Sequence, residues 1–203
     1  MNSKKIVHYI LLALPYAFSG CKEESDNNKQ APANTLFLSL NPSQTNIDFQ
    51  NTLTEGLNTN ILMYEYFYNG GGIAAGDFNK DGLVDLYFSS NMSDNKLYLN
   101  KGDFKFEDIT DVAKVDGKGE WCRGVAVVDI NNDGLQDIYV CATLKNSGNE
   151  RKNLLYINQG TDKNNVPYFK EMAEEYGLAD TGQSTQAAFF ACKGSPGRAI
   201  QLR

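Results

Sequence analysis

The chain has almost no histidine: the one imidazole among its 203 residues is His8. His8 lies in a segment that we expect to be removed, so the mature protein would have no Ser-His-Asp or Cys-His catalytic group and no histidine-ligated zinc. Basic residues are also outnumbered, with 19 lysines and arginines against 25 aspartates and glutamates. Because nucleic acids and anionic lipids are bound through clustered Lys and Arg, we expect no nucleic-acid partner, and the clustered acid points to bound cations.

Proline is scarce as well, at 5 residues, whereas glycine reaches 18. This balance suits a protein with many tight turns. The 11 tyrosines and 11 phenylalanines are typical of strands that pack large side chains. Long apolar runs are also missing: the one at residues 6–18 is interrupted by His8 and Pro15 and is too short to span a bilayer comfortably. Composition therefore favours an all-β protein.

The N-terminus has the parts of a secretory signal. Lys4 and Lys5 precede the apolar run, and Ser19, Gly20 and Cys21 follow it. Small residues directly before a cysteine resemble the bacterial lipobox, in which the cysteine becomes the lipidated first residue of the mature protein. The alternative is a plain signal peptide that is cleaved later, with Cys21 an ordinary thiol.

The residues after Cys21 fit an exported lipoprotein. The acidic run at residues 22–26 resembles the surface-export signal of Bacteroidetes lipoproteins. We therefore expect a signal peptide at residues 1–20 and a flexible acidic and polar tether at 21–44, in which residues 22–34 have too few apolar side chains to fold. Lipid at Cys21 would anchor the protein in the outer membrane, facing the cell surface.

Two segments of the chain repeat one pattern. Residues 72–89 read GIAAGDFNKDGLVDLYFS, and residues 124–141 read GVAVVDINNDGLQDIYVC. Further on, LYLNKG at residues 97–102 matches LYINQG at 155–160. Each unit reads as four short strands with turns between them, with brief helical turns at residues 108–114 and 171–176. A period of about 50–60 residues with four strands is typical of propeller blades.

We therefore predict an all-β fold, a partial β-propeller made of about two blades and the start of a third. The first repeat with its leading strand occupies residues 45–118, the second 119–185, and the third begins at 186–190. The expected acidic loop of the third repeat is missing, because Ala191 stands where an aspartate is due. The tail 191–203 is basic and unlike anything upstream. We interpret it as an out-of-frame, vector-derived or otherwise truncated end; the alternative is a genuine divergent terminus.

Each repeat carries an acidic nine-residue loop with the pattern D-x-N-x-D-G-L-x-D. Alternate residues of a tight loop bring their side-chain oxygens onto one centre, and the leucine at position 7 would add its carbonyl while its side chain enters the core. Hard oxygen ligands without histidine or cysteine suit Ca²⁺. We predict two Ca²⁺ sites: the ligands are Asp77, Asn79, Asp81, Leu83 and Asp85 in the first loop, and Asp129, Asn131, Asp133, Leu135 and Asp137 in the second.

Two other interpretations of these loops are an EF-hand and a metal-free turn. An EF-hand needs a glutamate at position 12 between two helices, but Phe88 and Val140 stand there and the flanks are strands. A metal-free Asx-Gly turn would use the same residues, although two loops with identical spacing favour the metal. Without a cation the three carboxylates of a loop repel one another, so the metal should stabilise the blade.

With both loops in view, the chain resembles the FG-GAP/VCBS repeat family, in which this loop joins two strands of a propeller blade. The resemblance rests on Gly72 and Gly124, the two acidic loops and the Leu-Tyr-x-Asn-x-Gly turns, and it covers about residues 45–190. It implies Ca²⁺ binding at the loop positions named above. Residues 68–72 and 121–124 further resemble lipid-anchored proteins that end in an ASPIC/UnbV domain.

The remaining candidates carry less information. Cys122 and Cys141 flank the second loop, but Cys122 should face about residue 144, so their pairing stays open. Trp121 and the aromatic residues Tyr64, Tyr66, Phe67 and Tyr68 are expected in the blade core rather than on a glycan-binding surface.

We expect a non-enzymatic, calcium-stabilised binding or scaffold module with a protein or glycan ligand. One alternative is the non-catalytic N-terminal part of a larger surface enzyme acting on polysaccharide. Another is a purely structural spacer.

Overall fold

The structure is a computed structural model that describes residues 36–117, 119–143, 151–191 and 199–202. The predicted signal peptide, Cys21 and the tether as far as residue 35 lie outside the described residues, as do residues 192–198 of the tail. All elements below belong to the compact unit Leu40–Arg203. In the described part of the chain, no helix has the length and apolar character needed to cross a membrane.

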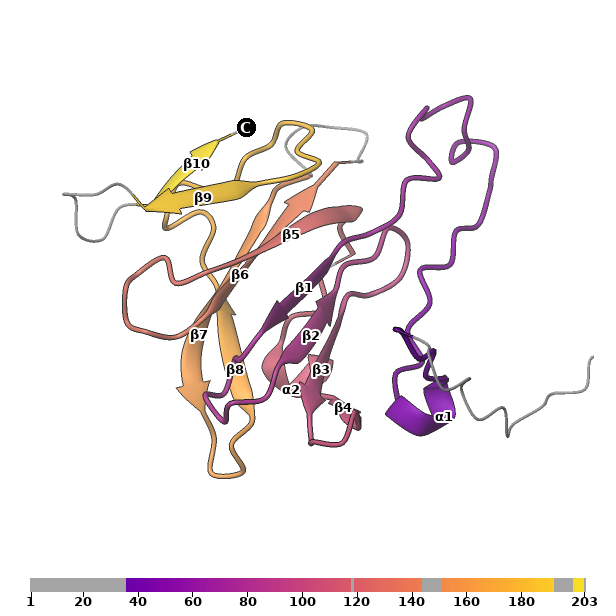
Figure 1. Ribbon diagram of the computed structural model, residues 1–203. Helices are drawn as coiled ribbons and strands as arrows, with labels where there is room; N and C mark the ends of the chain where they lie inside the picture. Colours follow the sequence, from indigo (N-terminus) through magenta and orange to yellow (C-terminus); the bar gives the residue numbers. More distant parts are fainter. Residues whose placement is uncertain (1–35, 118, 144–150, 192–198, 203) are drawn as a thin grey trace, which may run out of the picture. The chain divides into compact units, whose positions relative to one another are not determined.

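The first repeat folds into a four-stranded antiparallel sheet (Figure 1). Its strands follow one another in chain order, so each hairpin pairs with the next, as in a propeller blade. The prediction of an all-β blade is confirmed. The strands are β1 (Ile73–Gly76), β2 (Asp85–Phe88), β3 (Lys96–Asn100) and β4 (Phe106–Asp108).

The second repeat forms a second sheet with the same order and direction. A bulge between Cys122 and Val125 shifts the register of its first hairpin, so that Cys122 lies opposite Ala142 rather than near residue 144. Cys122 and Cys141 are both buried, and they do not form a disulfide with each other. The strands are β5 (Cys122–Val128), β6 (Asp137–Ala142), β7 (Leu154–Thr161) and β8 (Pro167–Glu171).

The elements outside the two sheets are short. The one-turn helix α1 (Pro42–Thr45) precedes the first repeat, and α2 (Thr110–Ala113) confirms the predicted helical turn after β4. The second predicted helical turn is a single turn at residues 173–177, in which the Tyr176 amide donates to the Met172 carbonyl at 3.1 Å without continuing into a helix. In the tail, β9 (Ala188–Ala191) pairs with β10 (Ala199–Leu202) as a two-stranded antiparallel sheet, and β9 contacts β5 as β5 contacts β1.

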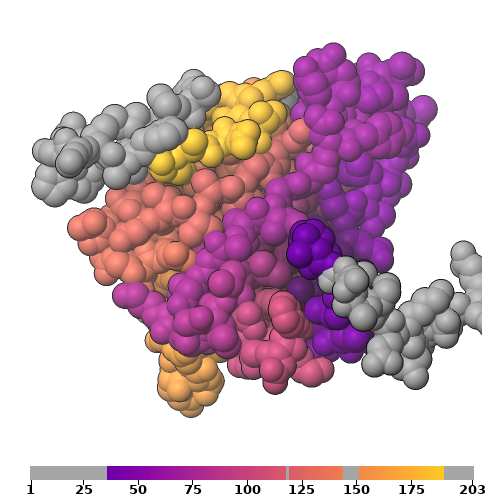
Figure 2. All heavy atoms as spheres, in the orientation of Figure 1, coloured from indigo at the N-terminus to yellow at the C-terminus, as the bar shows by residue number. Residues whose placement is uncertain are grey.

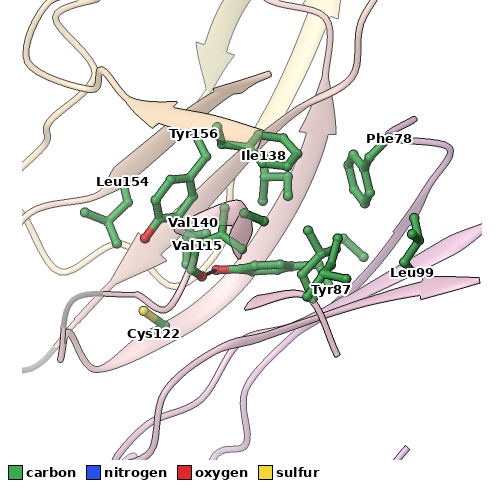
Figure 3. Close-up of a cluster of buried hydrophobic side chains, with 14 residues drawn as sticks. Phe78, Tyr87, Leu99, Val115, Cys122, Ile138, Val140, Leu154 and Tyr156 are labelled. Atoms are coloured by element: carbon green, nitrogen blue, oxygen red, sulfur yellow. Dashed lines mark hydrogen bonds between the residues drawn. The ribbon is translucent and has the colours of Figure 1, made fainter. Parts of the chain in front are cut away.

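The main hydrophobic core lies between the two sheets (Figure 3). Strand side chains alternate between faces, so Ile138 and Val140 of β6 face the first repeat while Tyr139 and Cys141 face a second cluster on the other side. Both faces of β6 are therefore covered, and all six of its residues are buried. The fully buried core side chains include Phe78, Tyr87, Leu97, Ala113, Val115, Cys122, Ile138, Val140 and Tyr156.

A tyrosine and an asparagine form the same polar bracket in each repeat. Asn95 donates its amide to the Tyr87 hydroxyl at 2.8 Å, and Asn153 donates to the Tyr139 hydroxyl at 2.9 Å. Both hydroxyls in turn donate to a backbone carbonyl of the segment after the outer strand, Val115 and Leu178. Each buried hydroxyl is thereby satisfied, which ties the strands of a blade to its closing segment.

The predicted aromatic core is confirmed only in part. Phe67 and Trp121 are buried, with their rings 5.5 Å apart. Tyr66 and Tyr68 are instead 49% and 60% exposed, so their prediction as core residues is wrong.

Two glycines, one just before β1 and one within β5, allow neighbouring backbone segments to approach closely. A Cβ at Gly72 would lie 2.7 Å from the Arg123 carbonyl oxygen, and one at Gly124 would lie 2.6 Å from the Thr185 oxygen. Both neighbours are backbone atoms, which cannot move aside as a flexible side chain would. Close packing of adjacent repeats therefore explains the glycine that precedes β1 and the one within β5.

Replacing Gly72 by alanine should lower the free energy of unfolding by about 2 kcal/mol, because a methyl group must displace packed backbone. Gly70→Ala is the matched control, since no atom lies within 4 Å of a Cβ there. Urea denaturation of both variants measures the difference. Equal stabilities of the Gly72→Ala and Gly70→Ala variants would show that the backbone at Gly72 is not in contact with β5.

Candidate functional site

Both predicted acidic loops are hairpin turns at the same end of their sheets. Residues 77–85 connect β1 to β2, and residues 129–137 connect β5 to β6. Each loop turns on two residues with positive φ at the same places: Lys80 at 59° and Gly82 at 86°, and Asn132 at 60° and Gly134 at 82°. Glycine tolerates this conformation without strain, which explains the Asp-Gly step of the motif.

The first aspartate of each loop holds the turn through backbone amides. Asp77 accepts from the Asp81 amide at 3.1 Å and the Gly82 amide at 3.0 Å. In the second loop, Asp129 accepts in the same way from Asp133 at 3.1 Å and Gly134 at 2.8 Å. The two loops are therefore folded by the same pair of bonds.

Positions 3 and 5 come together beside this aspartate. Asn79 donates its amide to Asp81 Oδ2 at 2.9 Å, and Asn131 donates to Asp133 Oδ2 at 2.8 Å. The carbonyl oxygens of both asparagines also accept from the amide of the following aspartate. The structure thus brings the predicted side-chain positions 1, 3 and 5 into one small cluster in each loop.

Position 9 is a buried aspartate that braces the loop against the strands. Asp85 is fully buried, and it accepts from the Phe78 amide at 3.0 Å and the Asn100 amide at 2.8 Å. Asp137 does the same with Ile130 at 2.9 Å and Asn158 at 2.8 Å. The asparagine of each Leu-Tyr-x-Asn segment is therefore part of the site. From the sequence alone, that segment is assigned only a short strand and a turn, with no role in the site.

Burial raises the pKa of Asp85 and of Asp137 to about 6. The two backbone hydrogen bonds on each carboxylate oppose this rise, and the neighbouring loop aspartates add to it. The pKa of each carboxyl is thus higher in the folded protein than its ordinary value of 3.8. Its contribution to the free energy of unfolding is therefore complete below about pH 4, where the group is protonated, and is lost as the pH rises through about 6. At neutral pH these loops therefore carry buried negative charge that a cation would offset.

The loop side chains offer oxygen atoms of the kind that a hard cation binds, but these oxygens already accept hydrogen bonds from backbone amides. In the described part of the chain, no three Asp, Glu, Cys or His side chains are gathered as a ready-made metal site. A carboxylate oxygen has two lone pairs, however, so each one that accepts a single amide can still accept elsewhere. Leu83 differs from the expectation: its side chain is 37% exposed rather than in the core.

Replacing Asp85 by alanine should cost roughly 3 kcal/mol of unfolding free energy without metal, because two buried amides lose their acceptor. Asp81→Ala is the comparison: that side chain is exposed, and its loss should cost under about 1 kcal/mol. Urea denaturation in the presence of chelator measures both. Similar losses for the two variants would contradict the bracing role of Asp85.

The comparisons with known proteins agree with this geometry. Residues 77–140 match the family model of the FG-GAP-like repeat. Over 72 residues the chain is 40% identical to cartilage acidic protein 1 of Xenopus tropicalis and 36% identical to that of Homo sapiens. The match covers 35% of this chain and 11% of each relative's length. The matched family segment begins at the first aspartate of one loop and extends beyond the other loop into β6.

Proposed function

We propose that this chain, whose residues 77–140 form an FG-GAP-like repeat, is a calcium-stabilised binding or scaffold module of a surface lipoprotein. One observation carries the calcium proposal: in both loops the side chains at positions 1, 3 and 5 gather through the same set of hydrogen bonds. A cluster with two carboxylates and an amide oxygen in each of two loops indicates a shared role. The ligand bound by the module as a whole is a separate question.

The donor set supports Ca²⁺ over other metals. Each loop offers carboxylate, amide and carbonyl oxygens, and neither contains histidine or cysteine. Such hard oxygen ligands suit Ca²⁺, which accepts six to eight of them in flexible geometry, whereas Mg²⁺ demands a strict octahedron. In the first loop Asp77, Asn79 and Asp81 would supply side-chain oxygens, Leu83 its carbonyl, and Asp85 its remaining lone pairs. The bound ion would supply positive charge that neutralises the clustered carboxylates.

The same assignment favours binding over catalysis. A glycosidase needs a pair of carboxylates beside its substrate. The carboxylates that cluster in the two repeats are the ones we assign to cations. The alternative, a non-catalytic N-terminal part of a larger surface enzyme, shares the calcium loops and would differ only in what else the parent protein contains.

Calcium should raise the melting temperature of the chain. At 10 mM, and with the sub-millimolar affinity of extracellular modules, each site would add about 2–3 kcal/mol, or about 5–10 °C. Calorimetric titration with CaCl₂ and thermal melts with and without chelator measure this. Asp77→Asn combined with Asp81→Asn should abolish one of two binding events.

The control for that double variant is Asp94→Asn, an exposed acidic residue outside both loops. It should leave the heat of calcium binding and the melting temperature unchanged. A chain that takes up no calcium, and melts identically in chelator, would refute the calcium proposal.

Cys21 should carry the lipid. When the full chain is expressed in a bacterial host, Cys21→Ser should abolish incorporation of labelled palmitate and release the protein from the membrane fraction. Cys122→Ser is the control, because that thiol is buried in the core and its loss should leave labelling intact. Labelling that persists in Cys21→Ser would exclude Cys21 as the lipid attachment site.

A further inference from the structure

The first acidic loop is held by the second repeat at three successive residues. Gln136 accepts the Asp77 amide at 2.7 Å, and Asn158 donates its side-chain amide to the Phe78 carbonyl at 2.8 Å. Asn79 donates to the carbonyl of Asn165, in the turn between β7 and β8, at 3.2 Å. In Figure 2 this turn, drawn in orange, protrudes beside the purple segment that contains the first loop.

The side chain at position 2 of the loop strengthens this contact. Phe78 is fully buried, and its ring lies 5.9 Å from that of Phe169 on β8. Figure 3 shows it pointing into the core shared with Ile138. Residues 77–79 are therefore part of the interface between the repeats as well as of the candidate cation site.

The second loop forms no such hydrogen bonds with a neighbouring repeat within the described residues, although Ile130 at its position 2 packs against the second hydrophobic cluster, as Ala187 and Phe189 do. Its positions 1 to 3 are Asp129, Ile130 and Asn131, and no neighbouring repeat donates to or accepts from them there. Asn131 is exposed, whereas Asn79 is 7% exposed. Two loops with one motif are thus in different environments.

The side chain that makes this contact and the residue that makes room for it do not recur at the matching positions of the other repeat. Position 8 is Gln136 in the second loop and Val84 in the first. The residue before the loop is Gly76 in the first repeat and Val128 in the second. A Cβ at Gly76 would lie 2.5 Å from the Gln136 amide oxygen, so the glycine makes the space that Gln136 occupies.

We propose that the first loop is a composite cation site, in which Gln136 and Asn158 of the second repeat position the Asp77–Phe78 backbone that carries the first ligand. Fixing that backbone lowers the ordering cost of binding. By linkage, a cation in the first loop then strengthens the docking of the two repeats by the same factor. The second loop binds its cation without this coupling. The inference rests on the calcium proposal above.

The test uses the full chain with the second loop disabled by Asp129→Asn and Asp133→Asn, titrated calorimetrically with CaCl₂. Gln136→Leu should weaken calcium binding at the first loop about 5–10-fold, because one hydrogen bond to the ligand-bearing backbone is lost. Gln136→Glu, which keeps an acceptor oxygen, should restore at least the original affinity. Val84→Leu, at the same loop position on an exposed site, should change it less than about twofold.

The reciprocal experiment disables the first loop by Asp77→Asn and Asp81→Asn. There Gln136→Leu should leave calcium binding at the second loop within about twofold. An equal loss at both loops would mean that Gln136 acts on its own loop, and it would overturn the proposal. If Gln136→Leu does not fold, Gly76→Ala displaces the same side chain and should weaken the first loop alone.

A metal-free measurement separates this inference from the calcium proposal. In chelator, Gln136→Leu should speed hydrogen exchange of the Asp77 amide at least about fivefold and leave that of Asp129 unchanged. Unchanged exchange at Asp77 would overturn the inter-repeat support whatever calcium does. Faster exchange with no calcium uptake by the original chain would keep the support and refute only the cation site.

Discussion

Aspartate oxygens that hold backbone amides are the interaction on which the rest of this structure depends. A hairpin turn of nine residues leaves several amides without strand partners, and Asp77 and Asp85 accept three of them in the first loop. Asp85 also accepts the Asn100 amide on β3. Buried amides need acceptors, so the turn would be costly without these side chains. The arrangement also concentrates negative charge at one end of each sheet. The same feature that folds the loop therefore gathers the carboxylates that we propose bind a cation.

The brace at position 9 explains why the motif extends beyond the loop. Asp85 and Asp137 bind the amide of an asparagine on the third strand, so the loop, the first hairpin and β3 or β7 form one unit. The Tyr–Asn bracket acts at the opposite end of each sheet, between the second strand and the closing segment. A blade is thus held at both ends by satisfied buried polar groups, with the apolar core between them.

The sequence was sufficient for the loops and sheets that both repeats share. Spacing alone predicted the loops and the four-stranded sheets, since Gly82 and Gly134 and the alternating apolar strands recur at matching places. The Tyr–Asn bracket was missed, although Asn95 and Asn153 precede their Leu-Tyr pairs at equal distance and a longer alignment of the repeats would have found them. The exposure of Tyr66 and Leu83 could not be predicted, because it depends on which neighbouring segment covers each side chain.

The contact between Gln136 and Gly76 belongs to a different class of feature. Neither residue recurs at its matching position, so internal repetition carries no trace of the pair, and only the packing of one repeat on the next brings them together. Two copies of a motif share ligands because the ligands lie within the motif. On the proposal above, their cation affinities would differ where the backbone behind those ligands is held by a neighbouring repeat. In a chain of stacked repeats, cation binding at one loop would therefore depend on how the next blade docks against it. Binding at a loop without that neighbour would depend only on the loop itself.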